Sequence, residues 1–392
     1  MNVFVIPSWY PSEQYPSTGI FFREQSRLLA THRPNWNVGI SLWGSHEPKL
    51  WLKAYAPLGG FIKYNSKPPI RKYENQLEYN CVEFFTPAFT WTRKFRNGNI
   101  RGIIAANRQN FERFTTHFGR PDVIHAHVSY PAGAIARALS EAYQVPYVIT
   151  EHMSPFPMAS FKKDIQKTVL PPLRAAGQVL AVSQALIKRL SEFGVRADRI
   201  SNFLDDRFFT PGSAQTGRFT LVAVGRLEAQ KNYEALLESI AHVQKTGVDF
   251  ALKVIGTGSR EKHLRNQCSQ LHLDGNVEWL GECNQNEVRQ ALRSANLMVN
   301  TSRHENQPVA ILEAMACGVP VLTFDWDGAD ELVFGDAGEV LPSDPILLAE
   351  KVKSLAQKNP YDPQKVRATF EDHFGTVAQV QKLEQYYQRL LE

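Results

Sequence analysis

The chain has 392 residues, of which 43 % are hydrophobic and 21 % are charged. This length and balance exclude a peptide, a scaffold that depends on disulfides and a disordered or fibrous chain, and they predict two or three compact domains. The net charge of +5 is divided unevenly, because residues 1–210 hold 26 basic and 15 acidic side chains while residues 211–392 hold 18 and 24. The first half either meets an anionic partner, such as a membrane surface, a lipid phosphate or an acidic substrate, or carries a solvated basic face. No aromatic and basic pattern typical of a nucleic-acid module is present in the sequence.

The N-terminus and the cysteines bear on the compartment. The chain enters a four-residue apolar run directly after Met1-Asn2, which is too short for a signal peptide and has no basic leader. No apolar run in the sequence approaches the roughly 18 residues of a membrane span. The cysteines show neither a Cys-x-x-Cys pair nor zinc spacing: Cys81, Cys268, Cys283 and Cys317. We therefore expect a cytoplasmic protein with reduced thiols.

Short β-branched runs alternate with helical segments along the whole chain. The predicted strands are residues 3–6, 122–125, 147–150 and 179–182 in the first half, and 219–224, 250–255, 277–280, 297–300 and 319–324 in the second. Strands that alternate with helical patterns of ten or more residues predict parallel sheets built from βαβ units. The predicted fold class is α/β, with two Rossmann-like doubly wound domains.

The domain boundary is predicted in the stretch 202–218, which is rich in Asp, Pro, Gly and small polar residues, as is typical of a linker. The predicted domains are residues 1–205 and 206–371. The last segment, 362–392, is predicted to be helical with an interruption near Gly375, and its part from about 372 onward is placed against the first domain, although periodicity alone does not decide this. The region 46–99 has no regular pattern.

A strand, a loop and a helix are predicted across residues 297–320. Pro308 suits the first turn of a helix, and Gly318 with Pro320 suits its end. Glu305 then lies in the loop and Glu313 within the helix, so both carboxylates can face one ligand. The start of the helix, including Val309 and Ala310, offers free N–H groups and a positive dipole end to a phosphate. The alternative is an ordinary capped helix with a solvated glutamate.

Two basic residues follow the first predicted strand of the second domain. Ligands of open α/β sheets bind outside the carboxyl ends of strands, so Arg226 and Lys231 are expected to point into the crevice there. Two fixed cations can hold a diphosphate and neutralise the charge that grows on it as a bond breaks. A pair of solvated basic residues without function is the alternative.

Histidines follow two predicted strands of the first domain. His125 and His127 come at the end of one strand, and His152 comes at the end of the next. Carboxyl ends of parallel strands share one sheet edge, so the three imidazoles are expected to lie near one another. Three histidines could form a zinc site, and the residues alone do not exclude it.

Several patterns of the second half, in this order and spacing, resemble glycosyltransferase family 4, the retaining nucleotide-sugar transferases of the GT-B fold. They are Gly225-Arg226 with Lys231, the turn Gly256-Thr-Gly258, Leu280-Gly281, and Glu305-x7-Glu313 leading into Gly318-Val-Pro320. The opening residues 6–11 and 19–25 resemble a subset of the family. Gly256 and Gly258 do not belong to a dinucleotide fingerprint, because Glu261 stands where the third glycine would be.

The resemblance implies a function for each matching residue. Two domains would face each other across a cleft, with Arg226 and Lys231 on the leaving phosphates, Glu305 on sugar hydroxyls, Glu313 on the ribose, and His127 near the transferred sugar. The other donor-binding positions would be Gly19, His152, Gly225, Gly256, Gly258, Gly281, Pro308, Val309 and Ala310. His125 would be structural or would support the site residues from behind, and no metal or other cofactor is expected, since family members of this fold generally need no site metal.

The predicted reaction moves a sugar from a UDP- or GDP-sugar to a hydroxyl of a saccharide or lipid-linked saccharide, as in bacterial surface polysaccharide or glycolipid synthesis. The basic stretch 93–101 with Arg108, Arg113 and Arg120 favours peripheral contact with an anionic membrane, at the inner face of the cytoplasmic membrane, or is a solvated helix face. Residues 306–309 depart from the family pattern, which leaves the identity of the donor open. A nucleotide-sugar epimerase of the same fold and a catalytically silent binding or scaffold protein are the alternative functions.

Overall fold

The computed structural model describes residues 1–12, 16, 18–44, 50–52, 71–78, 80–91, 96–212 and 217–392. The chain divides into two compact units, and each is described by itself. Unit 1 comprises residues 1–182, 186–203 and 377–392, and unit 2 comprises residues 183–185 and 204–376. The described part of the chain contains no helix that is long and apolar enough to cross a bilayer.

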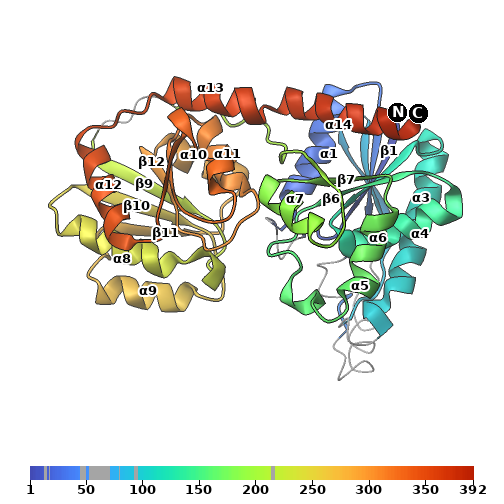
Figure 1. The fold of residues 1–392 in the computed structure, drawn as a ribbon, viewed down its shortest axis with the longest axis horizontal. Coiled ribbons are helices and arrows are strands. Elements are labelled where there is room, and N and C mark those ends of the chain that lie inside the picture. Colours follow the sequence, from blue (N-terminus) through green and yellow to red (C-terminus); the bar gives the residue numbers. More distant parts are fainter. Residues whose placement is uncertain are drawn as a thin grey trace. The chain divides into compact units, whose positions relative to one another are not determined.

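Unit 1 is built on an eight-stranded sheet with the order β3-β4-β2-β1-β5-β6-β7-β8 (Figure 1). Neighbouring strands are parallel except for β3 and β4, which are antiparallel. The strands are β1 (Asn2–Pro7), β2 (Asn37–Leu42), β3 (Tyr73–Glu78), β4 (Cys81–Phe85), β5 (Val123–His127), β6 (Tyr147–Glu151), β7 (Gln178–Ala181) and β8 (Asp198–Arg199). The helical segments are α1 (Ile20–His32), η1 (Arg96–Asn99), α3 (Ile100–Phe118), η2 (Ser129–Gly133), α4 (Ala134–Tyr143), η3 (Ala159–Phe161), α5 (Ile165–Thr168), α6 (Leu170–Ala175), α7 (Gln184–Ser191) and α14 (Thr376–Leu391).

Both faces of this sheet are covered by helices. Alternate residues of a strand point to opposite faces, so Phe4 packs with Phe111 and Phe114 of α3. Val3 and Val5 lie on the other face, in a cluster that includes residues of α1 and α14. The C-terminal helix α14 therefore completes the core of the N-terminal sheet.

Unit 2 is built on a six-stranded, wholly parallel sheet with the order β11-β10-β9-β12-β13-β14. The strands are β9 (Phe219–Val224), β10 (Phe250–Ile255), β11 (Val277–Gly281), β12 (Leu297–Asn300), β13 (Val321–Phe324) and β14 (Gly338–Leu341). The helical segments are η4 (Ala229–Lys231), α8 (Tyr233–Gln244), α9 (Glu261–Gln270), α10 (Gln285–Arg293), α11 (Val309–Ala316), η5 (Ala329–Glu331), η6 (Gly335–Ala337), α12 (Pro345–Gln357) and α13 (Pro363–Phe374). Two buried clusters, one on each face, hold these helices against the sheet.

Strand order reverses at β1 in unit 1 and at β9 in unit 2. In unit 1 the chain places β2 on one side of β1 and later adds β5 on the other side. In unit 2 it places β10 on one side of β9 and later adds β12 on the other side. In doubly wound sheets the crevice at the carboxyl ends of such strands is where ligands bind. The predicted fold class, α/β with two Rossmann-like units, is confirmed.

Unit 2 continues to Thr376, beyond the residue 371 expected from the sequence. The reason is α13, whose Val366, Phe370 and Phe374 are buried in the same cluster as Ile311 and Met315 of α11. The helical break near Gly375 is confirmed, because α13 ends at Phe374 and α14 begins at Thr376.

Candidate functional site

Two loops at the carboxyl edge of unit 2 are joined by hydrogen bonds. One follows β9 and the other follows β12, which are neighbours in the sheet. The Arg303 backbone N–H donates to the Gln230 carbonyl over 2.9 Å, and the Gln230 side-chain amide donates to the His304 carbonyl over 2.5 Å. The Thr301 hydroxyl donates to the Asn232 carbonyl over 3.0 Å. These contacts form a single platform where the strand order reverses.

The platform carries an ion pair between Lys231 and Glu305. The Lys231 ammonium donates to Glu305 Oε1, which also accepts a 2.7 Å hydrogen bond from the Ser302 hydroxyl. The side chains are 20 % and 9 % exposed, so the pair is largely withdrawn from water. Charge-assisted hydrogen bonds of this kind are stronger than neutral ones. The structure thus brings together two residues that the sequence placed 74 positions apart.

Gly225 borders the same ion pair. A Cβ atom built at this position would lie 3.5 Å from Lys231 Cε, so the lysine stem runs past the glycine. The Tyr233 hydroxyl donates to the Gly225 carbonyl over 3.2 Å, and the nearby charge of Glu305 helps burial raise the tyrosine pKa. Sequence reasoning missed Tyr233 and Ser302, since neither residue type by itself predicts a contact with this pair.

The Arg226 side chain takes no part in this ion pair and is 77 % exposed. Its guanidinium lies 3.6 Å from Glu228, whose carboxylate accepts from the backbone N–H and the hydroxyl of Ser259 over 3.1 and 2.6 Å. These hydrogen bonds, with Arg226, lower the pKa of Glu228. An exposed guanidinium with one loose partner is available to an anionic ligand.

Close backbone approach explains two of the predicted glycines. A Cβ at Gly256, where φ is +131°, would lie 2.0 Å from the Gly225 carbonyl oxygen, and one at Gly258 would lie 2.4 Å from the Leu227 carbonyl oxygen. The loop after β10 therefore touches the loop after β9 only because both residues lack side chains. Gly281 differs, since its φ of +69° needs a glycine while the space around it is open.

Helix α11 begins one residue later than its sequence indicates. Pro308 was expected in the first helical turn, but its ψ of 119° is extended and makes it the N-cap, so that the helix starts at Val309. No side chain caps this end. Val309 and Ala310 are the first two helical residues, as a phosphate site would require.

Glu313 lies in the middle of α11 and apart from the ion pair. Its carboxylate makes no hydrogen bond or ion pair with the described residues, and burial raises its pKa to about 7. The same carboxyl, when ionised, contributes to the raised pKa of the Cys317 thiol. The structure therefore does not join Glu313 to Lys231 and Glu305, although all three belong to unit 2.

The predicted site residues of unit 1 meet at the carboxyl edge between β1 and β5. The Ser8 hydroxyl donates to the His127 carbonyl over 2.9 Å, and this contact fixes the ends of the two strands together. His127 Nδ1 lies 3.3 Å from His152 Nε2, and the Phe22 ring centroid is 4.6 Å from one imidazole and 5.0 Å from the other. Gly19 is the N-cap of α1 at φ +70°, where a Cβ would lie 2.6 Å from the Trp9 carbonyl oxygen.

The imidazoles of His127 and His152 are uncharged at neutral pH. Burial lowers the pKa of His152 to about 3, and burial together with the neighbouring histidines lowers the pKa of His127 well below its usual value. His125 lies behind them, bonded to the hydroxyls of Tyr387 and Thr150. Among the described residues no group of three His, Cys, Asp or Glu side chains is arranged to hold a metal ion.

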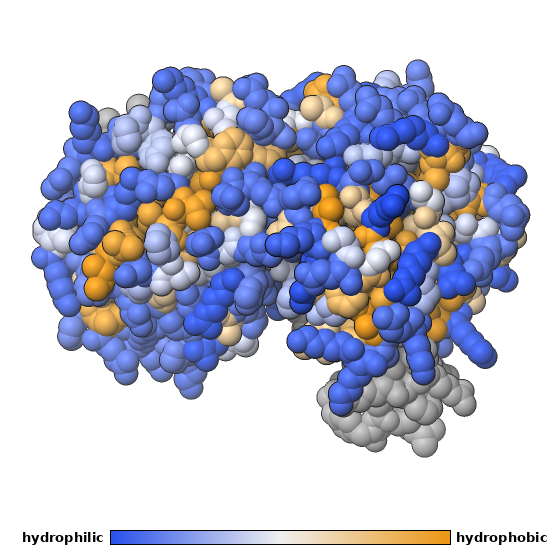
Figure 2. All heavy atoms as spheres, in the orientation of Figure 1, coloured by the Kyte–Doolittle hydropathy of each residue, from blue (hydrophilic) through white to orange (hydrophobic). Residues whose placement is uncertain are grey.

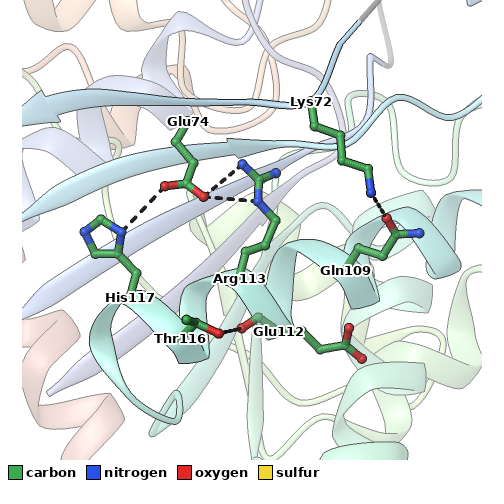
Figure 3. Close-up of a pocket in the computed structure, with 7 residues that line it drawn as sticks. All are labelled: Lys72, Glu74, Gln109, Glu112, Arg113, Thr116 and His117. Carbon is green, nitrogen blue, oxygen red and sulfur yellow. Dashed lines mark hydrogen bonds and ion pairs between the residues drawn. The ribbon is translucent and has the colours of Figure 1, made fainter.

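A separate surface pocket lies between β3 and α3, lined by Lys72, Glu74, Gln109, Glu112, Arg113, Thr116 and His117 (Figure 3). The Glu74 carboxylate is 2.9 Å from Arg113 and 3.6 Å from His117. These side chains of the pocket therefore pair with one another. None of the predicted site residues lines it. Arg113, expected on a free basic face, is engaged in this pocket.

The predicted basic stretch is described only in part. Residues 93–95 lie outside the described residues, as does the side chain of Arg96. Arg101, Arg108 and Arg120 are exposed. On the face drawn in Figure 2, hydrophilic side chains predominate and hydrophobic ones form smaller patches.

The two doubly wound parallel sheets are those of the GT-B fold, and the loops at the carboxyl edge of the second sheet carry the predicted Lys231 and Glu305. Residues 205–370 match the family model described as "Glycosyl transferases group 1", and residues 67–206 match the one described as "Glycosyltransferase Family 4". The two matches together span most of the chain. The chain belongs to this family of glycosyltransferases, as its motifs predicted.

Individual proteins of known name agree with this assignment. The chain is 28 % identical over 388 residues to TuaC of Bacillus subtilis, assigned as a teichuronic acid biosynthesis glycosyltransferase, with 93 % of this chain and 91 % of TuaC covered. Its fold is similar to that of sucrose-phosphate synthase from Thermosynechococcus elongatus, with a TM-score of 0.75, 15 % identity and 100 % and 99 % coverage. It is also similar to Anabaena Alr3699/HepE, solved in complex with UDP-glucose, with a TM-score of 0.71, 18 % identity and 99 % and 100 % coverage.

Proposed function

We propose that this glycosyltransferase moves a sugar from a nucleotide diphosphate sugar to a hydroxyl of a saccharide or lipid-linked saccharide, with retention of the anomeric configuration. The observation that carries the proposal is the Lys231–Glu305 pair on the platform between β9 and β12. A cation and a carboxylate held side by side offer one group to a departing phosphate and the other to sugar hydroxyls.

Different residues of unit 2 bind different parts of the donor. Lys231 and Arg226 stabilise the negative charge that develops on the leaving diphosphate, and the N-terminus of α11 adds its dipole. Glu305 accepts hydrogen bonds from the sugar, and Glu313 accepts them from the ribose hydroxyls. Gly256 and Gly258 let the loop after β10 pack against the loop after β9, and this packing holds Gly225 beside the stem of Lys231.

The residues of unit 1 support the assignment of the proton. An effective general base has a pKa near the working pH, whereas burial holds the pKa of His152 at about 3 and that of His127 well below its usual value. These imidazoles are weak bases, so we assign the acceptor's proton to the leaving phosphate. His127 then contributes hydrogen bonding near the transferred sugar without changing its charge.

A UDP-sugar is the first donor to test. HepE, which shares the fold, was solved with UDP-glucose, and TuaC is named for the synthesis of a bacterial surface polymer. The alternative is a GDP-sugar, because residues 306–309 depart from the family pattern.

The experiment has two stages. Thermal unfolding of the purified chain with UDP, GDP, ADP and their sugar conjugates identifies the donor base, since a ligand that binds only the folded state raises the midpoint. Transfer to an acceptor is then followed by proton NMR of the anomeric signal. An α product from an α-linked donor supports the proposal, and a β product overturns retention. Sugar interconversion without acceptor would indicate an epimerase, and donor binding without any product would indicate a scaffold.

We further propose that unit 1 contacts an anionic membrane at its cytoplasmic face, where a lipid-linked acceptor would be found. The exposed guanidinium groups of Arg101, Arg108 and Arg120 support this proposal. Sedimentation with anionic and with neutral liposomes at low salt tests it. Binding to anionic liposomes alone is expected, and no binding to either would overturn the membrane contact.

A further inference from the structure

A buried histidine in unit 1 is held between two hydroxyl groups from distant parts of the chain. His125, on β5, lies with Nδ1 2.6 Å from the Tyr387 hydroxyl and Nε2 2.7 Å from the Thr150 hydroxyl. All three residues are almost completely buried. Tyr387 belongs to α14, which the sequence places 262 positions further along the chain. Both ring nitrogens of His125 are thus engaged.

The same imidazole stacks on His127. Residues two apart on a strand point to the same face, and the ring centroids of His125 and His127 are 4.4 Å apart with an interplanar angle of 29°. His127 in turn lies 3.3 Å from His152. A continuous series of contacts therefore runs from α14 through His125 to the carboxyl edge of β5 and β6.

The hydrogen-bond donors in this series can be assigned. Burial lowers the pKa of His125 to about 3, so the ring is neutral, with one N–H donor and one acceptor nitrogen. Burial raises the pKa of Tyr387 well above its usual value, so its hydroxyl stays protonated. A phenol is a stronger donor than an aliphatic hydroxyl. The Tyr387 O–H therefore donates to Nδ1, and Nε2–H donates to the Thr150 oxygen.

Packing alone does not require these polar groups. Tyr387 lies in a cluster with Val3, Val5, Val380 and Leu383, where an apolar ring would fill the same space. Burying hydroxyl and imidazole groups costs free energy that their mutual hydrogen bonds only offset. What the polar contacts add is a defined ring plane and tautomer for His125.

We infer that Tyr387 is a positioning residue of the transferase: its hydroxyl fixes the His125 ring, and the stacked His125 ring sets the plane of His127. The inference rests on the proposed function of His127 beside the transferred sugar. Tyr387 does not touch substrate in this account, and it acts only through the two histidines.

The chain offers a matched control on the same helix. Tyr386 is also buried, and its hydroxyl hydrogen-bonds with the Arg199 carbonyl over 3.4 Å and with the side chain of Arg389. Tyr387→Phe and Tyr386→Phe each remove one phenol oxygen from α14. Both variants are first checked by thermal unfolding, and Thr150→Val and Thr150→Ser test the opposite side of His125, with the serine expected to restore what the valine loses.

Two readouts separate positioning from packing. Long-range proton–nitrogen NMR of the imidazoles is expected to show shifted His125 and His127 signals in Tyr387→Phe and unchanged ones in Tyr386→Phe. Tyr387→Phe should also lower kcat about three- to tenfold, as the loss of one buried hydrogen bond implies, and should leave the donor KM unchanged. Unmoved His127 signals, an unchanged kcat, or an equal effect of Tyr386→Phe would each overturn the inference.

A failure of this inference can be told apart from a failure of the proposed function. If His127→Gln leaves turnover at the parent level, the proposed function of His127 fails, and with it the catalytic part of this inference. The NMR comparison still decides whether Tyr387 orients His127, because it is measured on the chain without substrate. Shifted His127 signals in Tyr387→Phe would then support the structural coupling alone.

Discussion

The two sheets carry contrasting side chains at corresponding edges. In unit 2 the edge between β9 and β12 holds a cation and a carboxylate, Lys231 and Glu305. In unit 1 the edge between β1 and β5 holds the neutral imidazole His127, with His152 and Phe22 against it. The topology of the two edges is the same, so the difference lies in the side chains that each sheet presents.

The contrast shows how burial decides charge at a site. The imidazoles lie where water is excluded, and desolvation keeps them neutral. In the Lys231–Glu305 pair each side chain instead has a partner of opposite charge beside it. We therefore expect the cation of unit 2 to bind the diphosphate. The neutral imidazoles of unit 1 are expected to offer uncharged hydrogen-bonding groups beside the transferred sugar.

The largest effect is expected from removing the cation of unit 2. Lys231→Ala should lower kcat by a factor of about 100 to 1,000, which corresponds to the loss of one preorganised charged contact in the transition state. Steady-state kinetics with saturating donor measures this. Lys245→Ala, which changes an exposed lysine of the same unit, is the control and should leave kcat unaltered. A decrease in kcat of twofold or less in Lys231→Ala would mean that unit 2 does not stabilise the transition state through this charge.

A second effect concerns Glu313, a carboxyl of unit 2 whose pKa is raised by burial. The pKa of Glu313 is about 7 in the folded chain, against an ordinary value near 4.5. Between these values the folded chain keeps a proton that the unfolded chain has lost, so the free energy of unfolding should fall as pH rises from about 4.5 to about 7. Each pKa unit corresponds to about 1.4 kcal/mol.

Denaturant unfolding between pH 4.5 and 8 tests this, with Glu313→Gln as the variant that should remove this part of the slope. A bound donor should also flatten it, because ribose hydroxyls donate to the ionised carboxylate and favour that form. If Glu313→Gln keeps the full slope, the pH dependence has another origin.

The sequence predicted local patterns well and distant pairings poorly. The nine predicted strands are present, because each is a short β-branched run that remains buried between helices. β3 was missed because its residues are polar and mostly exposed at the sheet edge. β2 was missed because Gly39 interrupts its apolar pattern. A Cβ there would lie 2.1 Å from the Phe114 ring, a tertiary reason that a local pattern does not carry.

The same limit applies to the site. Gly225, Lys231 and Glu305 were found by motif, but their contact depends on β9 and β12 being neighbours in the sheet. The contact of His125 with Tyr387 had no local signal, since a tyrosine on an amphipathic helix is typical of any core. Tyr387, which we propose positions His125, therefore could not be identified as a site residue from the sequence.

A smaller effect is expected from unit 1. His127→Gln should lower kcat about tenfold, in keeping with the loss of one hydrogen bond to a neutral group. Because the pKa of His127 lies far below its usual value, the ratio of the parent rate to the variant rate should stay constant between pH 5 and 8. A step in that ratio near pH 6.5 would show a charged imidazole and remove the contrast between the two units.

The smallest effect is expected from a chelator. If Lys231 and Arg226 supply the positive charge that the leaving diphosphate requires, no divalent cation is needed, and EDTA should leave the transfer rate unchanged. Initial rates with EDTA, and with added magnesium or manganese, measure this in the parent chain and in Lys231→Ala. Stimulation of the variant alone would strengthen the assignment, because the metal would then replace a missing cation. Loss of the parent's activity with EDTA would show that the two basic residues do not suffice.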